Sequence, residues 1–198
     1  MSALTDEDRK SLLILARSVI ESEIIAGAKT KRPETSSPPL EEKRGCFVTL
    51  HKNEVLRGCI GTIEPVRSLI LNVEENAINA AFKDPRFPPV KRDELSAVDI
   101  EISVLTVPEI LNFKDGEDLK KKLLPNVHGV ILSREWHRAI YLPQVWEQLR
   151  DKESFLEHLC LKAGMEGSCW EDTETQVKIY QAEYFSESSL IQPQGPKG

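Results

Sequence analysis

The chain has 198 residues, of which 40% are hydrophobic and 29% charged, with a net charge of −6. This acidic balance argues against a nucleic-acid binder, because such proteins carry a basic footprint that neutralises phosphates. No apolar run approaches the roughly 20 residues that cross a bilayer, and the polar N-terminus is not a signal peptide; we therefore expect no membrane segment and a cytoplasmic protein.

The four cysteines, Cys46, Cys59, Cys160 and Cys169, include no CxxC pair. Cysteine-based zinc sites are usually built from such pairs, so we expect neither a metal site nor another cofactor. Without an export signal, the thiols are expected to be reduced.

The first half of the chain predicts a helix, a long loop, a strand pair and a second helix. Thr5 can cap a helix, with Asp8 three residues on as its capping-box partner, and Gly27 can end it. Residues 28–44 are polar and proline-rich, which predicts an exposed, mobile loop. An antiparallel hairpin follows, and then a helix that ends before Asp84-Pro85, because the residue before proline avoids the helical region. The hairpin is predicted at Cys46–His51 and Glu54–Ile60, and the helix at Ser68–Phe82.

In the second half, Val98 to Leu105 alternates apolar and polar residues, which is typical of a strand with one buried face. Strands that come in runs favour an α+β fold with a mainly antiparallel sheet. The remaining residues predict a short helix, a second hairpin, a fourth helix, a last strand and a disordered tail, at 115–124, 127–133 with 138–143, 151–163, 177–185 and 188–198.

The stretch LRGCIGTIEP, from Leu56 to Pro65, places an arginine, a thiol and two glycines on a predicted strand. Strand alternation puts Arg57 and Cys59 on one face and Leu56 and Ile60 on the other. Gly58 leaves a notch where another backbone or a helix can approach. A neighbouring cation stabilises a thiolate, and a guanidinium can also grip a carboxylate or phosphate. We therefore expect Arg57 and Cys59 to line a cleft together.

LRGCIGTIEP, together with NAINAAFKDPRFPPV, DIEISVLTVPE, HGVILS, YLPQVWEQ and YQAEYF in that order, resembles the AMMECR domain family. The resemblance implies one α+β domain over residues 1–187, with a larger lobe from both chain ends and a smaller central lobe. We expect its mainly antiparallel sheet to be flanked by helices and able to curve into a barrel-like form. The family has no firmly assigned reaction. Its microbial members often accompany a MEMO-like protein and a radical SAM enzyme, which implies these two as partners.

Two interpretations of the site stay open. In the first, the protein is a binding module whose cleft around Arg57 and Cys59 accepts a small acidic ligand or a partner. The other cleft residues would then be Gly58, Gly61, Glu64, Asp84 and Arg86. In the second, the protein is an enzyme in which Cys59 is the nucleophile, Arg57 its activating or substrate-holding cation, and Glu64 or Glu101 a nearby carboxylate. No histidine is tied to Cys59 as a base.

Simpler readings compete with both interpretations. Cys59 can merely pack as a small apolar residue. Arg86 can form an ion pair with Asp84 or Glu101, and Asp84 can make a turn hydrogen bond. We rank the binding module first, the enzyme second and a nucleic-acid binder third.

Overall fold

The computed structural model describes residues 3–25, 27–33 and 37–191. The chain forms two compact units. The larger unit contains residues 1–105 and 183–198, and the smaller one contains residues 106–182. This division confirms the predicted larger lobe from both chain ends and smaller central lobe.

The helices and strands of the larger unit are α1 (Asp6–Ile24), α2 (Pro38–Glu41), β1 (Cys46–Lys52), β2 (Val55–Thr62), α3 (Leu69–Phe82), the 3₁₀ helix η1 (Arg92–Ala97), β3 (Val98–Leu105), β8 (Ala182–Ser186) and α6 (Glu187–Ile191). Those of the smaller unit are β4 (Glu109–Ile110), α4 (Gly116–Lys122), β5 (Gly129–Arg134), β6 (His137–Tyr141), η2 (Pro143–Glu147), α5 (Lys152–Lys162), η3 (Cys169–Glu171) and β7 (Gln176–Tyr180).

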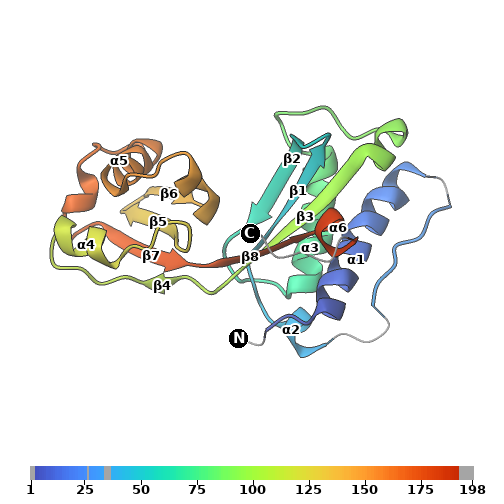
Figure 1. Ribbon diagram of the computed structural model, residues 1–198, viewed down its shortest axis with the longest axis horizontal. Helices are drawn as coiled ribbons and strands as arrows, with labels where there is room; N and C mark the ends of the chain where they lie inside the picture. Colours follow the sequence, from blue (N-terminus) through green and yellow to red (C-terminus); the bar gives the residue numbers. More distant parts are fainter. Residues whose placement is uncertain (1–2, 26, 34–36, 192–198) are drawn as a thin grey trace, which may run out of the picture. The chain divides into compact units, whose positions relative to one another are not determined.

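The larger unit is a sheet of order β2-β1-β3-β8 with α1 and α3 packed on one face (Figure 1). Strand β3 has the predicted bounds, and its apolar residues lie in the core with the inward side chains of β1. Helix α1 starts as predicted, because Thr5 and Asp8 form a capping box. We call the helix-covered side of this sheet the inner face and the opposite side the outer face.

The long loop before β1 is more ordered than its composition predicts. Its second half contains α2, where Leu40 is only 1% exposed, and Arg44 is buried and paired with Glu42. The prediction of an exposed, mobile loop over 28–44 was therefore wrong for this part. A proline-rich segment still joins the core when it carries an apolar residue that the core can bury.

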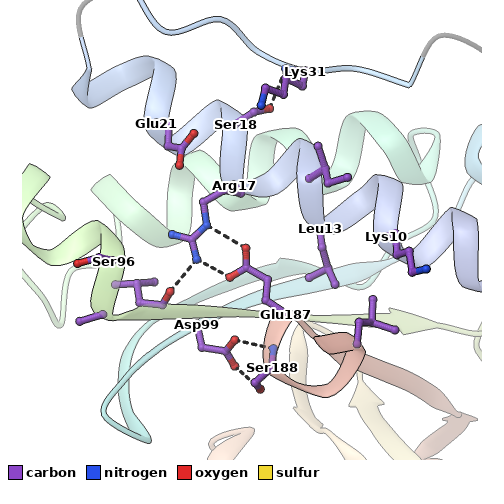
Figure 2. Close-up of a pocket in the computed structure, with 14 residues that line it drawn as sticks. Lys10, Leu13, Arg17, Ser18, Glu21, Lys31, Ser96, Asp99, Glu187 and Ser188 are labelled. Atoms are coloured by element: carbon purple, nitrogen blue, oxygen red, sulfur yellow. Dashed lines mark hydrogen bonds and ion pairs between the residues drawn. The ribbon is translucent and has the colours of Figure 1, made fainter. Parts of the chain in front are cut away.

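Helix α6 occupies residues that we expected to be disordered. Glu187 pairs with Arg17 of α1, and its carboxylate also accepts from the Ile100 N–H. Ser188 donates to the Asp99 carboxylate (Figure 2), and Leu190 packs against the core. The tail prediction was therefore wrong for residues 188–191, while residues 192–198 lie outside the described residues.

The smaller unit has a sheet of order β4-β7-β5-β6 with its own core. Trp146 and Phe155 stack with ring centroids 3.6 Å apart, and the Trp146 indole N–H donates to the His128 carbonyl. The predicted second hairpin is formed by β5 and β6. Both sheets are open along their strand orders over the part of the chain that the structure describes, so neither closes into a barrel.

The predicted strand over 177–185 is two strands in different sheets. It is interrupted at Gln181, whose N–H donates to the Thr106 hydroxyl and whose carbonyl accepts from the Thr106 N–H. β7 joins the smaller sheet and β8 joins the larger one. Strand propensity is continuous across Gln181, and only the change of sheet divides the run.

Candidate functional site

The outer face of the larger sheet carries polar side chains in register across three strands. Thr49 of β1 lies between Cys59 of β2 and Glu101 of β3. In the next row, His51 lies between Leu56 and Asp99. Directly opposed side chains on one face are within contact range, so the register gathers a thiol, a hydroxyl, an imidazole and two carboxylates.

Arg57 does not share this face. The pairing of β1 with β2 shifts between Leu50 and His51, which leaves Arg57 as the extra residue of a bulge. Its guanidinium donates to Glu94 of η1 at 2.9 and 3.2 Å, and Lys52, which follows the inner-face register of β1, donates to the same carboxylate. The expectation that Arg57 and Cys59 line one cleft was therefore wrong, because a bulge moves every later residue to the opposite face.

The bulge also reverses the face of the sheet on which Leu56 lies. We expected Leu56 and Ile60 to enter the core together, but Leu56 is exposed while Ile60 packs against the core. The hydrogen bonds of Arg57 leave its Nη1 buried without a partner among the described residues. The Arg57 side chain therefore lies in the interior of the larger unit, where it pairs with Glu94.

Asp84 and Arg86 close the free edge of β2 at Cys59. The Cys59 N–H donates to Asp84 Oδ2 at 2.9 Å, and Arg86 Nη2 donates to the Cys59 carbonyl at 3.1 Å. Two side chains thus replace the ladder bonds of an absent neighbouring strand, which protects an edge. Arg86 Nε also donates to Asp84 Oδ1 at 2.9 Å. The ion pair between Asp84 and Arg86 that we had weighed against a functional role is therefore present.

Arg86 supplies the cation beside Cys59 that we had assigned to Arg57. Hydrogen bonding to Asp84 is the largest cause that raises the pKa of Arg86, and the Cys59 thiol adds to the increase. The same hydrogen bonds from Arg86 lower the pKa of Asp84 well below its usual range, against the effect of burial. Asp84 is therefore charged and holds the guanidinium, whose side chain is 54% exposed.

The Cys59 thiol is half-buried and has a second neighbour in the Thr49 hydroxyl, which donates to Sγ at 3.3 Å. The other free thiol, Cys46, differs in every respect that matters for reactivity. It is fully buried, and burial raises its pKa to about 12. Cys59 is thus the free thiol with access to reagents.

Glu101 lies one strand further from Cys59 than we expected. It pairs with Thr49 rather than with β2 directly. Burial raises the pKa of Glu101; the His51 charge opposes the increase and Asp99 adds to it. Glu101 therefore lies next to the Thr49 hydroxyl as a carboxyl group whose charged form is disfavoured by burial.

The two glycines of the motif have packing roles. A Cβ on Gly58 would lie 2.3 Å from the Ala80 carbonyl oxygen of α3, which confirms that the notch admits a helix. A Cβ on Gly61 would lie 2.1 Å from the Phe47 ring. Glu64 lies on the exposed turn after β2. Ligand contacts of these three residues stay predictions.

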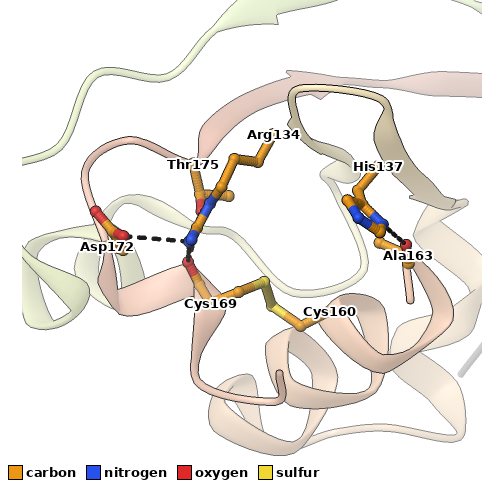
Figure 3. Close-up of a disulfide and its surroundings, with 7 residues drawn as sticks. All are labelled: Arg134, His137, Cys160, Ala163, Cys169, Asp172 and Thr175. Atoms are coloured by element: carbon orange, nitrogen blue, oxygen red, sulfur yellow. Dashed lines mark hydrogen bonds and ion pairs between the residues drawn. A yellow bond between two sulfur atoms is a disulfide. The ribbon is translucent and has the colours of Figure 1, made fainter. Parts of the chain in front are cut away.

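The smaller unit contains a disulfide between Cys160 of α5 and Cys169 of η3 (Figure 3). The expectation of reduced thiols was therefore wrong for these two residues. Gly164 ends α5 in a left-handed conformation with φ of 76°, and the turn leads back so that Cys169 meets the helix. The Cys169 carbonyl accepts from Arg134 and Thr175.

Among the described residues, no group of three or more His, Cys, Asp or Glu side chains is placed to hold a metal ion. A search of the same residues found no helix with the length and apolar character needed to span a membrane.

Fold and site together define an α+β protein of two units, with a thiol on the outer face of the larger sheet and a guanidinium at the free edge beside it. The family model named AMMECR1 matches residues 13–185, and the chain belongs to this family.

A protein of Methanothermobacter thermautotrophicus is 42% identical over 185 residues, covering 93% of this chain and 96% of its own. Protein MJ0810 of Methanocaldococcus jannaschii is 39% identical over 198 residues, covering 98% and 96%. The crystal structure of uncharacterized protein PH0010 from Pyrococcus horikoshii matches with a TM-score of 0.84 at 37% identity, covering 96% of each chain.

Proposed function

We propose that the larger unit is a binding module for a small acidic ligand, with Arg86 as the anion-binding group and Cys59 at its side. The observation that carries the proposal is the placement of the Arg86 guanidinium at the Cys59 carbonyl, where Asp84 holds it at two of its nitrogens. A guanidinium fixed in this way offers its remaining donors to a carboxylate at little cost in entropy.

Three further features support this binding site. The Phe87 ring lies 5.5 Å from the Arg86 guanidinium carbon and limits its movement. Nη1 of Arg86 forms no hydrogen bond with any described residue and remains available. The Thr49 hydroxyl offers a neutral hydrogen-bonding group on the same face as Cys59.

The test compares alkylation of Cys59 by iodoacetate, which is anionic, with alkylation by iodoacetamide, which is neutral. Cys59 can be followed alone in the native protein, because Cys46 is buried and Cys160 and Cys169 form a disulfide. Mass spectrometry of the Cys59 peptide gives both rates. Anion binding by Arg86 should lower the iodoacetate to iodoacetamide rate ratio at least about threefold in Arg86→Gln, and less in Arg86→Lys.

The matched control is Arg67→Gln, which removes an exposed arginine that pairs with Glu75. It should leave the rate ratio unchanged, since an exposed charge that is already paired with Glu75 is screened by water and salt. An equal ratio in wild type and Arg86→Gln, with both proteins folded by circular dichroism, would rule out the anion site.

A second candidate is an enzyme in which Cys59 is the nucleophile. It is favoured by the combination of the Thr49 hydroxyl donor and the nearby Arg86 cation, since both stabilise a thiolate. His51, two residues from Thr49 on the same face, is the candidate base. If this is correct, iodoacetamide should modify Cys59 well below pH 8.5, the ordinary pKa of a free thiol. A reaction that appears only near that pH would exclude the enzyme and leave the binding module as the remaining candidate.

Under either candidate, the MEMO-like protein and the radical SAM enzyme remain proposed partners. The partners would act on, or supply, the acidic ligand held at Arg86. Co-purification with wild type that is lost with Arg86→Gln would support them.

A further inference from the structure

The row of side chains that holds Cys59 ends at a carboxylate that the binding of an anion does not use. Cys59 of β2, Thr49 of β1 and Glu101 of β3 lie opposite one another on three neighbouring strands (Figure 1). We call these three residues the outer-face row. Arg86 stands at its β2 end, where it donates to the Cys59 carbonyl. The outer-face row is therefore bounded by a cation at one end and by a carboxylate at the other.

The Glu101 carboxylate is not matched by a group of the protein. In the part of the chain that the structure describes, it forms neither a hydrogen bond nor an ion pair, although the side chain is partly buried. Asp99, the other carboxylate on this face, differs because it receives both the N–H and the hydroxyl of Ser188.

The electrostatics of Glu101 agree with a missing partner. Burial is the largest cause that raises the pKa of Glu101, and the nearby charge of His51 opposes the increase without cancelling it. A partly buried carboxylate without a partner is costly. An ammonium group of a ligand would remove this cost, because it brings both the opposite charge and hydrogen-bond donors.

The side chains between the two ends are short and uncharged. Thr49 turns its hydroxyl toward the Cys59 sulfur, at 3.3 Å. The rows on either side present apolar groups, since the Phe47 ring lies over Gly61 and Leu56 is exposed. The middle of a ligand would therefore contact mainly apolar groups, which favours an uncharged chain there.

The spacing of the strands fixes the length of that chain. Neighbouring strands lie about 4.8 Å apart, so two spacings and one hydrogen bond separate the Arg86 guanidinium from the Glu101 strand by about 13 Å. A hydrogen bond at each end of the ligand takes up about 6 Å of this span, which leaves about 7 Å between its own charged groups. An extended chain of about five methylenes has this length, whereas an α-amino acid is too short to reach both ends.

We propose that Arg86 and Glu101 bind the two ends of a small ω-amino acid. Its carboxylate lies at Arg86, its ammonium group at Glu101, and its methylene chain across Cys59 and Thr49. The inference deepens the proposed function and rests on it, because Arg86 is the same anion-binding group. It narrows the acidic ligand to a zwitterion of defined length.

The experiment measures how ligands protect Cys59 of the full chain from iodoacetamide. The probes are 6-aminohexanoate, hexanoate, which lacks the ammonium group, and 3-aminopropanoate, which has both charges on a shorter chain. The half-protecting concentration of 6-aminohexanoate should be at least about fivefold lower than that of hexanoate, because the contact with Glu101 is added. 3-Aminopropanoate should protect no better than hexanoate. Mass spectrometry of the Cys59 peptide gives the rates.

Three variants locate the ammonium group. Glu101→Gln keeps the size of the side chain and removes its charge, so it should raise the half-protecting concentration of 6-aminohexanoate at least about fivefold and leave hexanoate unchanged. Glu54→Gln is the matched control, because it makes the same change at an exposed position of the turn between β1 and β2. His51→Gln should not weaken 6-aminohexanoate, since a charge on His51 competes with the ammonium group for Glu101.

Equal protection by 6-aminohexanoate and hexanoate would overturn the proposal, as would protection by 3-aminopropanoate that matches 6-aminohexanoate. Equal effects of Glu101→Gln and Glu54→Gln would overturn it too. A loss in His51→Gln as large as that in Glu101→Gln would assign the ammonium group to the imidazole instead, and absence of protection by all three probes would leave no ligand of this class.

The anion site at Arg86 is judged by a different measurement. The iodoacetate to iodoacetamide rate ratio of wild type and Arg86→Gln involves no added ligand, so it can support the anion site when the Glu101 contact fails. A ratio that is equal in these two proteins would remove the anion site, and the ω-amino acid with it.

Discussion

At the scale of single residues, Arg57 stabilises the larger unit through Glu94. The Arg57 and Glu94 side chains are only 11% and 15% exposed, so water competes weakly for their hydrogen bonds. Arg57→Lys should therefore lower the free energy of unfolding by about 1–3 kcal/mol, because a lysine ammonium cannot reproduce the paired hydrogen bonds of the planar guanidinium to the two Glu94 oxygens. Chemical denaturation measures this loss.

The control for Arg57 is Arg67→Lys, whose pair with Glu75 is exposed and should contribute about 0–1 kcal/mol. The iodoacetate to iodoacetamide ratio at Cys59 should be the same in Arg57→Lys and wild type. A reduced ratio with unchanged stability would return the anion-binding role to Arg57.

Glu94 makes the stability of the unit depend on pH. Hydrogen bonds from Arg57 and then Lys52 lower its pKa from the ordinary 4.5 to about 2. A depressed pKa contributes stability that is fully present above the unfolded value and is lost as the pH falls through the folded value. Stability should therefore decrease between about pH 4.5 and 2, and Glu94→Gln should flatten this slope. An identical slope in both proteins would contradict the assignment.

Gly58 permits the close approach of α3 to the sheet. Gly58→Ala places a Cβ against a backbone oxygen, so the helix must move, at a cost of about 1–3 kcal/mol. Gly61→Ala is not a milder comparison, because its Cβ would meet both the Phe47 ring and the Cys46 carbonyl oxygen, at 2.1 and 2.7 Å. Thermal melts should show a lower melting temperature for Gly58→Ala than for wild type. An unchanged melting temperature would mean that α3 does not restrict position 58.

At the scale of elements, the segment before α2 should be the most accessible to proteases. Lys29 and Lys31 are exposed outside any helix or strand, and Arg32 precedes a proline, which trypsin does not cleave. Arg44 is buried, and Lys43 bridges to Ser68. Limited trypsin digestion should therefore cut first after Lys29 or Lys31. Mass spectrometry identifies the site, and a first cut after Lys43 or Arg44 would contradict the docking of this segment.

At the scale of the whole molecule, the two units can be followed separately. The chain has three tryptophans, Trp136, Trp146 and Trp170, and all lie within residues 106–182. Tryptophan fluorescence therefore reports on the smaller unit, whereas circular dichroism reports on both. Replacing Cys160 and Cys169 by alanine should destabilise the fluorescence-detected transition by about 2–3 kcal/mol, as expected for a short closed loop.

The control for the disulfide is Cys59→Ala, which alters the larger unit only. The fluorescence transition should be unchanged in this variant. A disulfide variant whose fluorescence transition matches wild type would show that the bond contributes nothing to the smaller unit.

The sequence by itself determined the elements whose signals are local. The Thr5 capping box, the alternation of β3 and the proline after Asp84 act within a few residues, so α1, β3 and the end of α3 could be predicted. The close approach of another element at Gly58 could also be predicted, because a glycine within a strand often marks a place where a neighbouring backbone comes near.

Only the tertiary structure decided which side chains meet. One bulged residue moved Arg57 to Glu94 and left Arg86, 29 positions later, as the cation beside Cys59. The same holds for the Cys160–Cys169 disulfide and for α6, which Arg17 and Asp99 hold in place. The ion pairs and hydrogen bonds join residues far apart in the chain, and the two cysteines, nine residues apart, meet only through the path of the loop between them. No local period or propensity encodes these contacts, because register and loop path are set by the packing of the whole unit.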